Sequence, residues 1–120
     1  AAVEETDKAL CGIGLVLMEQ GQHEGAFDYF ARAMNKNPEN IIALNCLVRE
    51  AYQLDRVESA LPHLEDTLRT GVEAEAVRVT LAGCLIYLGR SDDARQHLET
   101  VLGANPANNN AKELFDTMAA

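Results

Sequence analysis

The sequence contains no tryptophan, and only 5% of its residues are aromatic. A chain so poor in aromatic side chains, in which Ala and Leu recur throughout, favours helices packed through small side chains over a β-sandwich. Hydrophobic residues make up 48% of the composition, which is ordinary for a globular core and too high for a disordered tail. We therefore expect an all-α globular fold.

Basic residues are also scarce, because 10 Lys and Arg stand against 19 Asp and Glu, for a formal net charge of −9. This charge repels a phosphate backbone, and no stripe of bases gathers on one segment, so we expect no nucleic-acid partner. No apolar run approaches the ~20 residues that a membrane span needs. The first residues lack the basic and then hydrophobic regions of a secretory signal, so we expect no membrane insertion.

Cysteine is present only three times, at scattered positions, which does not make a disulfide framework. This usage favours a reducing compartment, and we predict a cytoplasmic protein. No Gly-rich phosphate loop, nucleophile elbow or zinc helix motif occurs. We accordingly expect no enzymatic activity, no cofactor and no metal site.

The sequence contains an internal repeat with a period of 34 residues. Shifting the chain by this length aligns the segment 14–21 with 48–55 and then with 82–89, and each segment reads as a helix that ends in a turn. Small residues recur in register at Ala26, Ala60 and Ala94. Four residues later come Phe30, Leu64 and Leu98. Such a pattern places small residues where two helix axes cross and larger ones where a gap must be filled.

The pattern resembles the tetratricopeptide repeat family, and repeat one matches it at eight positions: Leu10, Ile13, Gly14, Leu17, Ala26, Phe30, Ala33 and Pro38. Repeat three departs with Arg78 where a large apolar residue is usual, and repeat two departs at Val48, Ala51 and Val72. The resemblance covers Asp7 to Pro106. It implies a right-handed α-solenoid in one domain, residues 1–120, with helix-turn-helix repeats at about 7–40, 41–74 and 75–108.

Residues that are typical of helix starts and ends agree with this organisation. Four glycines stand where a helix must end with positive φ: Gly21, Gly71, Gly89 and Gly103. Ser91 reads as the N-cap of a helix whose first turn contains two acids, and Pro62 requires its helix to begin near Glu58. The asparagines 108–110 are expected to cap a last helix, at about 109–119, that closes the stack.

In this family the first helices of successive repeats line a concave groove that is the usual binding surface. The resemblance implies that the groove of this chain is lined by Cys11, Leu15, Met18, Ile42, Asn45, Arg49, Tyr52, Val79, Gly83, Ile86 and Tyr87. The set is mostly apolar, with polar groups available to fix a peptide backbone or a single acid. The alternative that some of these residues only pack between repeats stays open.

One subclass of the family grips the C-terminal carboxylate of heat-shock chaperones through basic and amide side chains. The five corresponding positions here are Cys11, Leu15, Cys46, Ala76 and Thr80. None carries a positive charge that would pair with a carboxylate, which argues against that role. Cys11 and Cys46 can face each other, but buried cysteines are more often apolar fillers than reactive thiols. His23 is expected in a turn, in contact with solvent.

We therefore predict a protein–protein interaction module, a scaffold or adaptor that binds a peptide or protein segment in its groove. Two alternatives remain: a substrate-recruiting accessory domain of a larger enzyme, and a small acidic secretion chaperone. Because the sequence begins without Met, it is also readable as a fragment of a longer chain. No capping helix is expected before repeat one, so homodimerisation through that end is a further alternative.

Overall fold

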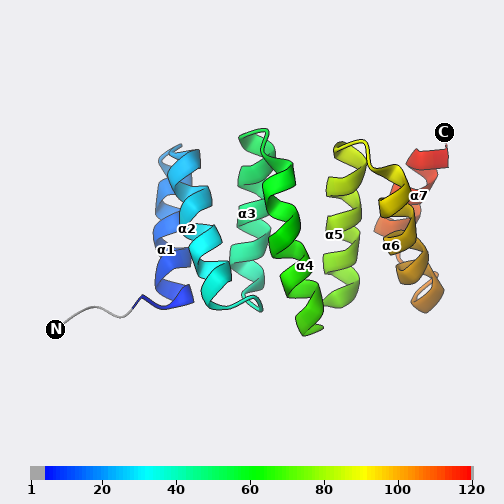
Figure 1. Cartoon of the computed structure of the whole chain (residues 1–120), viewed down its shortest axis with the longest axis horizontal. Helices are drawn as coiled ribbons and strands as arrows, with labels where there is room; N and C mark the ends of the chain where they lie inside the picture. The colour runs from blue at the N-terminus through cyan, green and yellow to red at the C-terminus, as the bar shows by residue number, and fades with distance from the viewer. Residues whose placement is uncertain (1–4, 120) are drawn as a thin grey trace. The chain divides into compact units, whose positions relative to one another are not determined.

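The computed structural model describes residues 5–119, which form an all-α structure (Figure 1). Its elements are α1 (Asp7–Glu19), α2 (His23–Lys36), α3 (Ile41–Gln53), the 3-10 helix η1 (Val57–Ala60), α4 (Leu61–Thr70), α5 (Ala74–Tyr87), α6 (Ser91–Ala104) and α7 (Asn109–Ala119). The described residues contain no strand, so the predicted all-α class is confirmed. No helix in this part of the chain combines the length and the apolar character needed to span a bilayer.

The chain divides into two compact units, and the division falls inside α4, between Asp66 and Thr67. In the first unit α2 packs against both α1 and α3, and Figure 1 shows these three helices side by side. In the second unit α5 packs on α6, and α7 contacts both of them. Each unit thus contains a helix pair followed by the first helix of the next pair, which is the arrangement that the 34-residue period predicts.

The small residues in register lie in the core. Ala26, Ala60 and Ala94 are completely buried, as predicted. In the first unit an added Cβ on Gly14 would lie only 2.7 Å from the ring of Phe30, because that ring occupies the space beside the glycine. Glycine is therefore required at this position by close contact with an aromatic ring.

Helix ends follow the period even where the residue type changes. Gly21, Gly71 and Gly89 have positive φ, as predicted, and Asp55 takes the corresponding conformation in repeat two with φ of 53°. The prediction for Gly103 was wrong, because α6 continues through that residue to Ala104. The turn there belongs to the following Asn-Pro segment, so the glycine is an ordinary position of the last helical turn.

The starts of three first helices share one capping hydrogen bond. The side chains of Thr6, Asn40 and Asn108 each accept a bond from the backbone N–H three residues on, at 3.0, 3.0 and 2.9 Å. This confirms the capping expected for the last helix. The prediction for Ser91 was wrong: it is the first residue of α6, and Arg90 precedes it as N-cap without a side-chain cap bond.

Pro62 is the second residue of α4, and the 3-10 helix η1 directly precedes that helix. The helical stretch therefore begins at Val57, beside the predicted start at Glu58. A tight 3-10 turn brings the chain into the helix before the proline, whose missing N–H then falls in the first α-helical turn, where it costs least.

Candidate functional site

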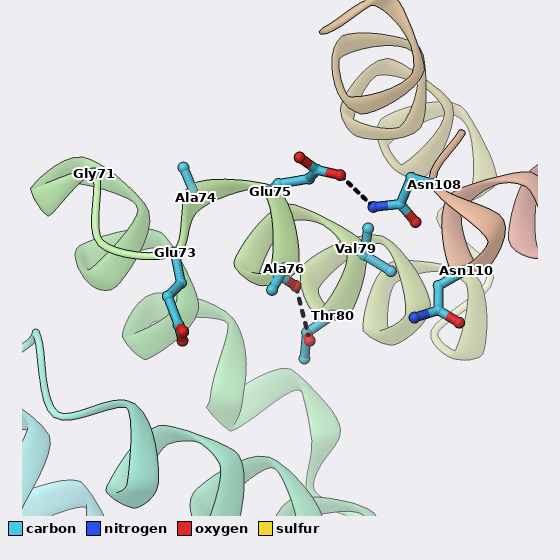
Figure 2. Close-up of a pocket in the computed structure, with 9 residues that line it drawn as sticks. All are labelled: Gly71, Glu73, Ala74, Glu75, Ala76, Val79, Thr80, Asn108 and Asn110. Atoms are coloured by element: carbon cyan, nitrogen blue, oxygen red, sulfur yellow. Dashed lines mark hydrogen bonds between the residues drawn. The ribbon is translucent and has the colours of Figure 1, made fainter. Parts of the chain in front are cut away.

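Each unit has an open pocket beside the start of a first helix. The pocket of the first unit has a volume of about 570 Å³ and is lined by Asp7, Lys8, Cys11, Gly12, Leu15, Asn37, Glu39, Asn40, Ile41 and Ile42. The pocket of the second unit has a volume of about 610 Å³ and is lined by Gly71, Glu73, Ala74, Glu75, Ala76, Val79, Thr80, Asn108 and Asn110 (Figure 2). We call them the α1 pocket and the α5 pocket.

The two pockets are built from corresponding positions of repeats one and three. The lining residues Asp7, Lys8, Cys11, Gly12, Asn40 and Ile42 stand two repeat lengths before Glu75, Ala76, Val79, Thr80, Asn108 and Asn110, in that order. The same backbone path therefore produces a hollow at both places, and the side chains decide what each hollow can bind.

An acidic side chain held by two amides marks the rim of the α1 pocket. Asp7 Oδ2 accepts hydrogen bonds from Asn37 Nδ2 at 3.2 Å and from Asn40 Nδ2 at 2.9 Å. The bond from Asn37, and then the bond from Asn40, hold the pKa of the Asp7 carboxyl below its usual value. The carboxylate thus fastens the start of α1 to the turn between α2 and α3 while it is ionised.

The α5 pocket repeats this arrangement with a longer acid. Glu75 Oε1 accepts hydrogen bonds from Asn108 Nδ2 at 2.6 Å and from Asn105 Nδ2 at 2.7 Å. Figure 2 shows the Glu75 carboxylate directed at Asn108, and Glu73 directed away from that pair. The bond from Asn108, and then the bond from Asn105, lower the pKa of Glu75.

Repeat two has lost all three members of this arrangement. The acid is replaced by Ile41, and the two asparagines by Gly71 and Ala74. The turn that precedes α5 instead uses two residues with positive φ, Gly71 at 82° and Glu73 at 44°. The three positions have changed together, as expected if the acid and the amides form one structural unit.

The lowered pKa of Asp7 predicts a specific dependence of stability on pH. Because the folded state binds the proton more weakly than the unfolded chain, this stabilisation is present above the ordinary carboxyl pKa and is lost as the pH falls through the folded value. Asn37→Asp keeps the acceptor for the backbone N–H of Glu39 but replaces the donated bond by a like charge. We expect the pKa of Asp7 to rise in this variant.

Carboxyl titration followed by NMR measures this change directly. The matched control is Asn105→Asp, which acts on Glu75 in the other unit and is expected to leave the titration of Asp7 as it is. An unchanged pKa of Asp7 in Asn37→Asp would contradict the assignment of the amide bonds as its cause.

The α1 pocket is the more apolar of the two. Cys11 is buried, whereas Leu15 and Ile42 are 36% and 65% exposed, so large apolar side chains border the hollow and face solvent. Burial raises the pKa of the Cys11 thiol, and the neighbouring Cys46 raises it further. The Cys11 side chain is therefore an apolar wall of the pocket, because a raised pKa disfavours the reactive thiolate.

The α5 pocket offers mostly polar groups at the corresponding positions. Thr80 replaces Gly12, and Asn110 replaces the exposed Ile42. The hydroxyl of Thr80 donates to the backbone oxygen of Ala76 at 3.1 Å, as Figure 2 shows. Val79 supplies an apolar side chain, and the carboxylate, hydroxyl and amides beside it make this pocket more polar than the α1 pocket.

Four of the predicted groove residues line these pockets: Cys11, Leu15 and Ile42 in the α1 pocket, and Val79 in the α5 pocket. The remaining seven are not among the lining residues of either pocket. Of these, Asn45, Arg49, Tyr52 and Tyr87 are exposed, and Met18, Gly83 and Ile86 are half-buried.

The sequence reasoning missed the amide-held acids at the two rims. Asp7 and Glu75 stand in register two repeats apart, and the asparagines that bond them stand 30 and 33 residues after each acid. An acid followed by asparagines 30 and 33 residues later occurs twice in the sequence, two repeat lengths apart, and this recurrence is the signal that could have found them.

Two histidines lie in polar contacts that the sequence did not indicate. His23 was expected in a turn but is the first residue of α2, with Nδ1 2.6 Å from the Oε2 of Glu50, whose side chain is 1% exposed. His97 Nδ1 accepts a bond from Arg78 Nη1 at 3.1 Å, which gives the unusual arginine of repeat three a partner. Among the described residues no group of three or more His, Cys, Asp or Glu is placed to hold a metal ion.

Comparison with known proteins agrees with the repeat pattern. Profiles described as tetratricopeptide repeat match residues 7–40 and 51–115. The chain is 28% identical over 101 residues to DnaJ homolog subfamily C member 3 of Homo sapiens and of Bos taurus. The match covers 84% of this chain and 20% of each relative, so the chain spans about a fifth of the length of these curated relatives.

Solved structures with the same fold include the first TPR of Spaghetti (RPAP3) bound to the HSP90 peptide SRMEEVD. Its TM-score is 0.71 at 17% identity, and the match covers 96% of this chain and 94% of that one. A structure of MamA, MSR-1 C2, has a TM-score of 0.67 at 20% identity, with 96% of this chain and 68% of that chain covered. With one profile matching more than half of its residues, the chain belongs to the tetratricopeptide repeat family.

Proposed function

We propose that this chain is a protein-interaction module that binds a segment of a partner protein along α1 and the start of α3, with an apolar side chain of that segment seated in the α1 pocket. The observation that carries this proposal is the exposure of Leu15 and Ile42 beside a hollow of about 570 Å³. Pockets of this size that are bordered by apolar side chains and contain a few fixed polar groups are typical ligand sites.

The fixed polar groups of the α1 pocket lie at its rim. Both oxygens of a carboxylate can accept several bonds, and the two asparagines occupy only Oδ2 of Asp7. Oδ1 is thereby held in place as an acceptor for a backbone or side-chain N–H of the segment. A preorganised acceptor beside an apolar anchor is the combination that gives a short segment both affinity and orientation.

The structure of the Spaghetti TPR supports binding of a peptide by this fold, but its ligand is not the one proposed here. That peptide, SRMEEVD, contains three acids. The α1 pocket of this chain is bordered by Asp7 and Glu39 against a single base, Lys8. The five positions of the carboxylate-binding subclass carry no positive charge, so we propose an apolar anchor in place of an acidic terminus.

Affinity capture from the lysate of the source organism tests this function. We expect the wild-type chain to enrich a partner, and Ile42→Asp to lose it, since the substitution places a charge at the mouth of the α1 pocket. The matched control is Ile13→Asp, which changes another exposed isoleucine, 44% exposed and outside the pocket. At the roughly micromolar affinity typical of short segments, we expect a loss of about 10-fold or more.

Circular dichroism must show both variants folded before the captures are compared. A partner that Ile42→Asp retains as well as wild type does would count against the α1 pocket. Loss of the same partner from Ile13→Asp alone would move the binding surface to the other side of α1.

A further inference from the structure

The side of α1 that faces away from α2 and from the α1 pocket carries exposed apolar residues. Its residues are Ala9, Ile13 and Val16, which we call the outer face of α1, and Ile13 and Val16 are 44% and 55% exposed. One repeat later Ala43, Leu47 and Glu50 are 0%, 0% and 1% exposed. Two repeats later Val77, Leu81 and Cys84 are 3%, 1% and 0% exposed.

The first unit shows what covers these positions on α3. Helix α2 packs against α3, and its first residue, His23, contacts Glu50 directly. Phe27 and Met34 follow His23 at helical spacing on the same stripe of α2, and they are 6% and 3% exposed. Thus a second helix, α2, packs on α3, and the stripe of α2 that starts at His23 carries two buried, bulky apolar side chains.

From this correspondence we propose that the outer face of α1 is a repeat interface that takes one more helix of the α2 type, the second helix of a further repeat placed before α1 as α2 is placed before α3. Apolar residues at three positions of α1 that are buried in both other repeats carry this inference. It is independent of the α1 pocket, which lies on another side of the same helix.

The residues of the outer face also define the chemistry of the helix that fits it. On α3 the residue opposite the first position of α2 is Glu50, which binds His23, whereas α1 has Val16 there. The helix that covers α1 therefore carries an apolar residue at its first position, where α2 carries His23.

A second copy of this chain fits the face less well. Two outer faces brought together would place only Ala9, Ile13 and Val16 against the same residues, without the bulky side chains that α2 contributes at its interface. Each chain also carries a net charge of −9, which opposes association.

The experiment uses an extended chain, in which a copy of residues 6–39 replaces residues 1–5 directly before Thr6. This junction reproduces the native connection between Glu39 and Asn40, because Thr6 and Asn40 cap their helices in the same way. In the original chain Val16→Asp changes an exposed side chain, so its melting temperature is expected to move little. In the extended chain the same substitution at the native Val16, with the added copy unchanged, is expected to lower the melting temperature by roughly 3 to 8 °C.

A second pair of variants tests which residue type fits the first position of the covering helix. The two variants are expected to shift the melting temperature in opposite directions. His23→Val in the added copy places an apolar residue opposite Val16 and is expected to raise the melting temperature of the extended chain. The same substitution at the native His23 removes the partner of Glu50 and is expected to lower it.

Equal effects of Val16→Asp in the two chains would overturn the proposal. So would a dimer of the original chain, detected by light scattering at several concentrations and abolished by Val16→Asp, because the occupant would then be a second copy.

Discussion

Replacing Gly14 by alanine is expected to lower the free energy of unfolding by about 1–3 kcal/mol, although alanine is the better helix former. The added Cβ would lie 2.7 Å from one carbon and 2.9 Å from another carbon of the Phe30 ring, which is itself completely buried. A completely buried ring has little room to move, so the overlap outweighs the ~1 kcal/mol that an alanine gains over glycine inside a helix.

The same helix supplies the matched control. An added Cβ on Gly12 meets nothing within 4 Å, so Gly12→Ala is expected to stabilise the chain by about 0.5–1 kcal/mol. Urea unfolding measures both variants. We expect the same glycine-to-alanine change to lower the free energy of unfolding at position 14 and to raise it at position 12.

Replacing the Phe30 ring by a smaller side chain should relieve the overlap with the added Cβ. Repeat three combines Ala82 with Leu98, the residues that correspond to Gly14 and Phe30. Gly14→Ala combined with Phe30→Leu is expected to be more stable than the sum of the single effects predicts, with a coupling of about 0.5–3 kcal/mol. Strict additivity would contradict the steric explanation and leave the glycine without a packing reason.

The second large effect is expected at the contact between His23 and Glu50. His23→Val leaves a carboxylate that is 1% exposed without its partner, and we expect it to cost about 1–3 kcal/mol. The cost lies below the roughly 3–5 kcal/mol of a fully buried pair, because the His23 side chain is 34% exposed and water can replace part of the bond.

Replacing both partners by apolar residues should recover most of this loss. His23→Val with Glu50→Val replaces both partners by apolar residues, the type that the sequence carries one repeat later at Val57 and Cys84. Glu24→Ala is the control, since it removes only an exposed ion pair with Arg56 at 3.4 Å and should cost less than ~1 kcal/mol. A double variant no more stable than His23→Val would contradict the account of the contact.

The apolar part of the fold could be predicted from the sequence, because the 34-residue period repeats the small and large apolar residues that are buried in each repeat. The alanines at 26, 60 and 94 are buried for the reason the period gives, and even Asp55 adopts the conformation expected of a glycine. The error at Gly103 has the opposite origin. Glycine permits positive φ without requiring it, and the following Asn-Pro turn ends the helix.

The polar contacts were harder to predict, because each joins residues 19 to 33 positions apart whose types do not indicate a partner. Asn37 read only as a turn residue, and its side chain does accept the N–H of Glu39, yet its amide also bonds Asp7. The burial of Glu50 could not be predicted either, since glutamate is among the residues that are least often buried. It is buried where His23 contacts it, at a position that holds Val16 and Cys84 in the other repeats.

Site-specific photo-crosslinking tests the central claim, that the α1 pocket receives an apolar side chain of a partner segment. A benzophenone amino acid is placed at Ile42 in one chain and at Val16 in another, and crosslinked products from the source lysate are identified by mass spectrometry. We predict a discrete adduct from position 42 that contains an apolar residue of one partner and is absent at position 16. Capture of the same partner equally from both positions, or of none from position 42, would contradict the claim.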